Sequence, residues 1–347
     1  MGRVAGRPRG QYPDMARALP GKAGPRTAGR ASGHGHDAHA PHRIPVRGWL
    51  QVLSRAARHV LDDRLMALAA AVSFFAILSI APLLVTALSV YGAVNTPDQA
   101  LDQLSSVAEV LPPELEPLVA EQLTTITTAS TQVLTWRGLS GLAAALVTAT
   151  TAATYLIDAL TLAYSETESR SFLRRTGLAV TFVLGGALVL GGVIAGTGAL
   201  SRQLDRLPDP LRPLAPALLW LALAVALALV LAVLYRFAPD RERARWRWIS
   251  GGAAFATALW LATSVALFAY VQSLGSYETT YGSLGGVAIS MFWLWLSVFL
   301  VIVGATVNAE SERQTARDST VGPERPPGER GAVVADSVPP HPGERSG

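Results

Sequence analysis

Six long apolar stretches constrain the fold of this chain more than any other feature of its sequence. Each stretch reaches the roughly 20 residues that an α-helix needs to cross about 30 Å of hydrocarbon. Charged residues make up 16% of the 347 residues, whereas a soluble domain carries about 25%, and most of them lie between the stretches or in the tails. The sequence therefore predicts an all-α, polytopic membrane protein with spans at about 65–91, 139–164, 177–200, 211–235, 249–271 and 284–307.

The positions of the basic residues predict how the spans are oriented. All but four of the 29 Lys and Arg residues lie in the N-terminal segment, in the loops after the second and fourth spans, or in the C-terminal tail. The four others are Arg137, Arg202, Arg206 and Arg212. Short loops rich in Lys and Arg stay on the cytoplasmic side of a membrane. We therefore expect both termini in the cytoplasm, and we expect basic residues that follow topology rather than a nucleic-acid-binding surface.

The segments outside the spans divide the chain into three parts. Residues 1–45 are rich in Gly, Arg, Pro and His and are expected to form a disordered cytoplasmic arm, and residues 314–347 a disordered cytoplasmic tail. The six-helix membrane domain then covers residues 46–313. It opens with residues 47–63, where apolar residues recur at helical spacing and Arg residues lie mainly elsewhere on the wheel. This pattern predicts an amphipathic helix at the membrane surface.

The first outer loop, residues 93–137, is acidic. Apolar residues recur three and four apart along it, and the pattern is interrupted at Pro112 and Pro113. The loop is therefore predicted to form two amphipathic helices on the outer surface.

Sequence motifs for catalysis and cofactor binding give little support to an enzyme. The chain has no Cys, so a disulfide or a Cys-based zinc site is excluded. No phosphate-binding loop, dinucleotide fingerprint or HExxH motif is present, so nothing indicates ATP-driven transport and no cofactor is expected. His34, His36, Asp37 and His39 resemble a nuclease metal motif, but the Asp spacing is wrong and no strand precedes them. Adventitious metal binding is the simpler interpretation of this His-rich tract.

The first span is interrupted by polar residues and a proline. Pro82 frees a carbonyl one turn earlier, near Leu78, and Ser79 or a neighbouring helix could satisfy it. Two interpretations follow. Ser79 and Pro82 could mark a broken helix that lines a pathway, or an ordinary kinked helix, which is the commoner case because Pro is frequent in membrane helices.

The second span contains an ionisable residue, Asp158, about one and a half turns before its cytoplasmic end. A carboxylate at this depth is costly and needs a partner or water. Asp158 could therefore handle a substrate or ion, or it could reach the interface and pair with Arg170 or Arg174. The threonines of the same span, Thr148, Thr150, Thr151 and Thr154, are expected to hydrogen-bond their own helix.

The following loop and the third span contain two further motifs. Glu166 and Arg170 are four residues apart, which predicts a helical salt bridge or a hinge before Phe172. Gly192 and Gly196 form a GxxxG pattern in the third span. Small residues let two helices approach closely, and packing inside the bundle is favoured over a dimer interface.

The last span is preceded by Tyr281 and Gly282 and ends in Asn308-Ala309-Glu310. The glycine allows a tight entry to the helix. Asn308 could cap or bridge helices, and Glu310 could pair with Arg313, three residues on, at the cytoplasmic end. Both residues are also candidates for a substrate or ion pathway.

Three segments resemble the YihY/BrkB family of bacterial inner-membrane proteins. They are "ALAAAVSFFAILSIAPLL" in the first span, "AYSETESRSFLRR" with Glu166, Arg170 and Phe172, and "YGSLGGVAISMFWLWLSVFLVIVGATVNAE", which begins at Tyr281 and Gly282. The resemblance covers about residues 45–313 and implies a six-span inner-membrane protein with cytoplasmic termini. Family members are described as transporters or virulence-associated factors, and the family label ribonuclease BN is regarded as mistaken.

Two hypotheses for the function follow from these features. The first is a transporter or lipid-handling protein without ATP hydrolysis, whose partners are membrane lipids and a transported solute or lipid. The alternative is a scaffolding membrane protein that docks partners through the acidic outer helices, residues 98–130. Neither hypothesis requires catalysis.

Overall fold

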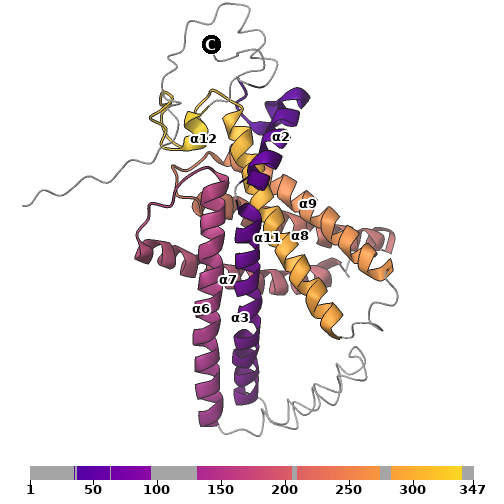
Figure 1. The fold of residues 1–347 in the computed structure, drawn as a ribbon. Helices are drawn as coiled ribbons and strands as arrows, with labels where there is room; N and C mark the ends of the chain where they lie inside the picture. The colour runs from indigo at the N-terminus through magenta and orange to yellow at the C-terminus, as the bar shows by residue number, and fades with distance from the viewer. Residues whose placement is uncertain are drawn as a thin grey trace, which may run out of the picture.

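The chain is helical wherever its structure is described, apart from loops and one isolated β-bridge between Ala244 and Thr320. A computed structural model describes residues 35, 37–62, 64–94, 131–204, 209–273 and 283–337. Its elements, shown in Figure 1, are η1 Pro41–Arg43, α2 Val46–Asp62, α3 Leu65–Val94, α6 Thr131–Ala163, α7 Phe172–Leu204, η2 Asp209–Leu214, α8 Ala215–Phe237, α9 Trp246–Ser273, α11 Ser283–Arg313 and α12 Val333–Asp336. The outer helices predicted within 93–137 fall mostly outside the described residues, although α6 already begins at Thr131.

Six helices are long and apolar enough to cross a membrane, as the sequence predicts. The candidate spans are Leu65–Ala87, Thr135–Ala163, Phe172–Leu204, Arg212–Phe237, Trp246–Ser273 and Gly286–Arg313. Large apolar side chains along them stay exposed, for example Leu188 at 79% and Phe268 at 67%. Soluble proteins rarely expose such continuous apolar surface, so this surface is suited to contact with lipid.

Helices α3 and α6 lie side by side along much of their length (Figure 1). Gly141 permits their close approach, because a Cβ added there would lie 2.9 Å from Pro82 O and 2.8 Å from Thr86 Oγ1. Pro82 lies inside α3, which continues as one helix through it. Thr86 Oγ1 donates a hydrogen bond to Pro82 O at 2.9 Å. Pro82 therefore belongs to a helix–helix seam.

Helix α2 follows the amphipathic pattern that the sequence predicts. Its buried face carries Val52 and Ala56, which pack against Val307 of α11. A second, apolar stripe of α2 remains exposed and includes Val46 at 77% and Leu50 at 65%. The first face attaches α2 to the bundle, and the second is largely exposed.

Four segments that are distant in sequence meet at one end of the bundle, which we call the tail-side end. They are residues 37–45, 164–171, 238–245 and 314–337. Thr315 Oγ1 donates to Ala38 O at 2.8 Å, and Glu242 N donates to Gly331 O at 3.0 Å. Val333 N donates to a Glu166 carboxylate oxygen at 2.7 Å. These contacts agree with the expectation that the four basic segments share one side of the membrane.

Residues 314–337 are packed against the membrane domain, although their composition predicts a disordered tail. Val321 N donates to Arg243 O at 2.9 Å, and Val334 is buried. Within the tail, Asp318 accepts hydrogen bonds from Thr320 N at 2.9 Å and Arg325 N at 3.0 Å. Hydrogen bonds between side chains and backbone stabilise turns without a large apolar core. A prediction of disorder from low hydrophobicity does not take such bonds into account. Residues 338–347 lie outside the described part.

The end of the predicted N-terminal arm is also packed. Ala38 and Ile44 are buried against Trp248 of α9, so packing against the spanning helices begins before residue 46. A few apolar residues are enough to pack this Gly- and Pro-rich segment, because α9 supplies the large aromatic side chain of Trp248 as a partner. Residues 1–34, which make up most of the arm, lie outside the described residues.

Candidate functional site

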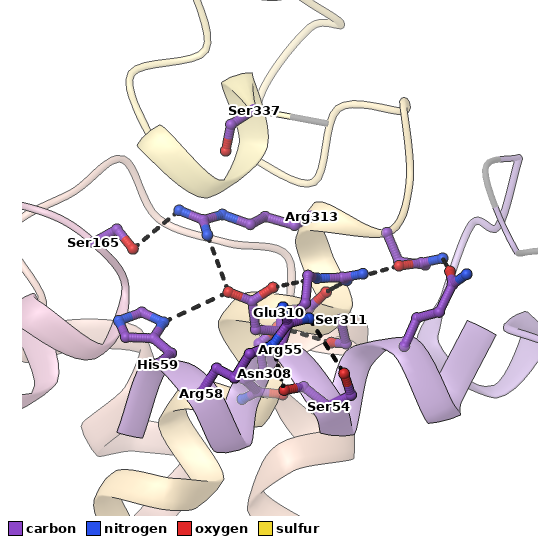
Figure 2. Close-up of polar contacts among 12 residues, drawn as sticks. Ser54, Arg55, Arg58, His59, Ser165, Asn308, Glu310, Ser311, Arg313 and Ser337 are labelled. Atoms are coloured by element: carbon purple, nitrogen blue, oxygen red, sulfur yellow. Dashed lines mark hydrogen bonds and ion pairs between the residues drawn. The ribbon is translucent and has the colours of Figure 1, made fainter. Parts of the chain in front are cut away.

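Glu310 is the centre of a polar network at the tail-side end (Figure 2). Its side chain is 2% exposed and accepts a hydrogen bond from Arg55 Nε at 2.7 Å. Arg313 Nη1 lies 3.0 Å and His59 Nδ1 3.5 Å from its other oxygen. The expected pair with Arg313 is therefore present. Arg55 belongs to α2, 255 residues earlier in the chain, so Glu310 also connects α2 to the end of α11.

The end of α6 positions a further contact to this network. Ser165 has a positive φ of 57°, and its N donates to Leu162 O while Glu166 N donates to Thr161 O. This pair of bonds closes the helix as a Schellman motif does. Arg313 Nη2 then donates to Ser165 Oγ at 3.0 Å (Figure 2). The network thereby joins α2, α11 and the loop after α6.

Asn308 bridges α11 to α9. Its side chain is fully buried, and its Oδ1 accepts from Gly252 N at 2.8 Å while its Nδ2 donates to Ile249 O at 2.9 Å. A Cβ on Gly252 would overlap the Asn308 amide and lie 2.7 Å from Gly304 O. All polar atoms of the Asn308 side chain are thus occupied by the protein. This geometry supports bridging, which is one of the two roles that the sequence suggests for Asn308.

A second buried ion pair lies beside this network. Arg241 Nη2 is 2.8 Å from Glu312 Oε2, with both side chains at most 2% exposed, and Ser319 Oγ donates to the same carboxylate at 2.9 Å. The Arg241 guanidinium also lies 4.8 Å from the centre of the Tyr164 ring. Burial opposes its charged form, but the neighbouring Glu312 holds the pKa of Arg241 above its ordinary value.

Glu166 and Arg170 do not pair with each other, because residues 164–171 are not helical. Glu166 instead accepts a hydrogen bond from Val333 N, and its burial raises the pKa of its carboxyl despite that bond. Arg170 Nε lies 3.2 Å from Asp240 Oδ1, and its Nη2 donates to Ala238 O at 2.7 Å.

These contacts hold the loop after α6 to the tail and to the loop before α9. Phe172, the first residue of α7, is 78% exposed. Tyr281 and Gly282 lie outside the described residues.

Asp158 pairs with Arg175 of α7, and not with Arg170 or Arg174 as the sequence suggests. Both side chains are partly exposed, at 25% and 28%. Only Asp158 Oδ2 is engaged. Asp158 Oδ1 is buried and has no hydrogen-bond partner among the described residues. This half-satisfied carboxylate lies within the candidate span Thr135–Ala163.

The other polar residues of the first two spans mostly bond to their own helix. Ser79 Oγ donates to Ala76 O at 2.6 Å, so it does not reach the Leu78 carbonyl that Pro82 leaves free. Thr148, Thr151 and Thr154 donate to carbonyls three or four residues earlier, as expected. Thr150 differs, because its buried Oγ1 has no partner among the described residues.

The five pathway candidates therefore do not form one site. Ser79 and Pro82 lie on α3, Asn308 and Glu310 join the tail-side network, and Asp158 contacts Arg175.

Gly192 and Gly196 do not mediate helix packing within the described part of the chain. A Cβ on either residue would meet no atom within 4 Å. The expectation of close packing inside the bundle is therefore wrong for these residues. The GxxxG pattern shows only that a close approach is possible, and the neighbouring helices α6 and α8 pack elsewhere on α7.

Sequence reasoning missed Arg55 and His59, which contact Glu310, and the neighbouring pair of Arg241 and Glu312. One signal was available for two of them. Arg55 and His59 lie on the same helical face as the buried Val52 and Ala56, so they point toward the bundle.

Comparisons with known proteins agree on one family. The family described as Virulence factor BrkB matches residues 56–329. The ribonuclease-like protein YfkH of Bacillus subtilis is 30% identical over 175 residues, which cover 49% of this chain and 63% of YfkH. A UPF0761 membrane protein of Verminephrobacter eiseniae is 29% identical over 273 residues, covering 77% of this chain and 63% of the relative. One of Delftia acidovorans is 25% identical over 297 residues, covering 83% and 67%.

The chain thus spans about two thirds of the length of these curated relatives. No solved structure matches it. The family match extends from the middle of α2 into the tail and so includes Glu310, Glu312 and their partners His59, Arg241 and Arg313, while Arg55 lies one residue before it. With six candidate membrane spans and a family match over more than half of its length, the chain belongs to the Virulence factor BrkB family of bacterial membrane proteins.

Proposed function

We propose that this chain is a transporter or lipid-handling protein of a bacterial inner membrane that works without a nucleotide-binding site of its own. The tail-side end faces the cytoplasm in this proposal, since Lys and Arg collect there. Its partners are membrane lipids and a transported solute or lipid. The observation that supports the proposal most is the ion pair of Asp158 and Arg175 within two candidate spans.

Charged residues inside a span are costly and usually mark a pathway for a polar or charged species. Asp158 Oδ1 has no described partner, so it can accept a proton or a hydrogen bond from a passing polar group. Thr150 lies two turns deeper on a similar side of α6, and its Oγ1 is likewise without a described partner. The two residues give α6 a polar side that leads from the middle of the span toward the tail-side end.

The proposal assigns no catalytic role to this chain. One relative has the printed name of a ribonuclease-like protein, while the two UPF0761 relatives are named only as membrane proteins. A scaffolding role would depend on residues 98–130, which lie outside the described residues.

A flux assay with the full chain in vesicles tests the role of Asp158. The vesicles contain phosphatidylcholine, phosphatidylglycerol and a trace of fluorescently labelled phosphatidylglycerol, and dithionite quenches the label in the outer leaflet. We expect the wild-type chain to move the label between leaflets and Asp158→Asn to slow it at least about tenfold, the effect typical of one lost catalytic or relay group. Asp158→Glu should retain most of the rate.

Two controls make the result interpretable. Asp336→Asn removes a carboxylate from the tail, where it accepts hydrogen bonds from Gly328 N and Arg330 N, and should leave the rate unchanged. Native mass spectrometry of the wild type and Asp158→Asn reports a bound solute or lipid that is lost in the variant. Equal flux in both forms would exclude Asp158 as a site, and wild-type flux equal to that of empty vesicles would exclude movement of this lipid.

A further inference from the structure

An open recess at the tail-side end is lined by basic side chains. It has a volume of about 390 Å³ and is lined by His39, Ala40, His42, Arg43 and Arg247. The first four belong to the segment that contains η1, and Arg247 is the second residue of α9. Every ionisable side chain in the lining is a His or an Arg, so the chemistry of the recess favours an anion.

Arg43 and Arg247 differ from the arginines of the neighbouring network in having no partner among the described residues. Arg55, Arg241 and Arg313 each contact a carboxylate. The side chains of Arg43 and Arg247 make no hydrogen bond or ion pair with any residue that the structure describes. Arg43 and Arg247 are both exposed, so an anion that enters the recess can reach both guanidinium groups, which match phosphate oxygens well.

The two arginines lie on elements that are fixed to each other. Pro41 packs so closely on α9 that a Cβ on Gly251 would lie 3.2 Å from its Cβ. Ile44, next to Arg43, is buried with Trp248, next to Arg247. The recess is therefore a built feature of the fold, and its cations do not depend on a mobile loop for their spacing.

The surroundings of the recess indicate an anion that carries apolar chains. The candidate span of α9 begins at Trp246, one residue before Arg247. The exposed apolar stripe of α2 begins three residues after Arg43, and it consists of Val46 at 77%, Leu50 at 65%, Leu53 at 39% and Leu61 at 68% exposed. A basic recess between an apolar helix face and the start of a span combines the features of an anionic lipid site.

We propose that this recess binds the phosphate of an anionic phospholipid, with Arg43 and Arg247 as the phosphate-binding residues and the exposed stripe of α2 along its acyl chains. The adjoining recess shares His39 and Arg247 with this one but also contains Asp318 and Glu324 together with Arg245 and Arg317, so its lining is mixed rather than purely basic. The site is separate from Asp158, and it stands whether or not Asp158 takes part in transport.

Native mass spectrometry of the full chain, titrated in detergent with one lipid at a time, tests the proposal. We expect dioleoyl phosphatidylglycerol to bind at least about tenfold more tightly than dioleoyl phosphatidylcholine, because each basic residue contributes measurably to anionic lipid binding. The double variant Arg43→Gln/Arg247→Gln should abolish this difference. The matched control Arg137→Gln/Arg202→Gln removes the same charge from exposed positions on α6 and α7 and should preserve it.

Two outcomes would overturn the proposal. Equal affinity for the two lipids, or an unchanged preference in the Arg43→Gln/Arg247→Gln variant, would show that the recess does not select an anionic lipid. A separate titration with inorganic phosphate distinguishes the sources of the anion. Phosphate that binds as tightly as phosphatidylglycerol, and displaces it, would assign the recess to a free anion and exclude the lipid.

Discussion

Glu312 at the tail-side end and Asp158 within α6 both pair with an arginine, but their surroundings differ. Glu312 is fully buried and contacts Arg241 and Ser319. Asp158 is a quarter exposed, contacts Arg175 through one oxygen, and keeps a buried oxygen without a described partner. The first arrangement uses the carboxylate fully, and the second leaves part of it available.

This difference separates structural from functional candidates among the acidic residues. A buried carboxylate whose oxygens are all engaged holds segments together, and Glu310 and Glu312 hold α2, the loops and the tail to the end of α11. A carboxylate that lies within a span and has one oxygen without a partner is a candidate for a functional role. The proposed roles of Asp158 and of the tail-side network rest on this contrast.

Removal of the arginine partner from each pair should have very different effects on stability. Arg241→Met leaves Glu312 buried without its counter-charge, and we expect a loss of about 3–5 kcal/mol. Arg175→Met should cost less than this, because Asp158 is only half engaged and can become neutral by taking up a proton. Unfolding in mixed micelles of increasing dodecyl sulfate content measures both.

The double variant Arg241→Met/Glu312→Leu provides the control for this comparison. It removes both charges and should recover most of the stability that Arg241→Met loses. Equal losses for Arg241→Met and Arg175→Met would contradict the distinction between the two pairs.

Glycine substitutions compare a packed region of the bundle with a helix face that has no described neighbour. Gly252→Ala places a methyl group onto Asn308 and should cost about 1–3 kcal/mol. Gly192→Ala meets no neighbouring atom and should leave stability unchanged or raise it by up to about 1 kcal/mol, since Ala favours helix over Gly. The same unfolding assay measures both variants. A loss of stability in Gly192→Ala, instead of the expected gain, would reveal a contact of α7 with a second molecule.

Acid should loosen the turn of the tail that Asp318 holds. Burial would raise the pKa of Asp318, but hydrogen bonds from Thr320 and Arg325 hold it below its ordinary value of 3.8. The stabilisation from Asp318 is therefore present above that pH and is lost as the pH falls through the lowered pKa.

Hydrogen exchange of residues 318–330, corrected for the intrinsic rate, should show a small loss of protection between about pH 5 and about pH 3. In Asp318→Asn, protection at the higher pH should already be reduced and should change less with acid. Wild-type protection that stays constant over this range would exclude a contribution from Asp318.

Much of the architecture follows from local sequence patterns. Runs of apolar residues such as those around Leu188 predict spanning helices, because a backbone in lipid must satisfy its own hydrogen bonds. The alternating loops rich in Arg predict that residues 37–45, 164–171, 238–245 and 314–337 share one side, and their contacts agree. The apolar spacing in α2 likewise predicts its amphipathic character. These features depend on residues that are close in sequence.

The partners of the polar residues depend on the tertiary structure. Glu310 contacts Arg55 across 255 residues of chain, and no local rule specifies that choice among 29 Lys and Arg residues. The GxxxG pattern at Gly192 predicts a packing site, yet a Cβ there would meet no atom of the described part. The sequence by itself determined the helices and their sides, because hydrophobic burial and backbone hydrogen bonding act locally. Only the tertiary structure decided which charges are neutralised and which remain available, because that depends on the spatial arrangement of distant segments.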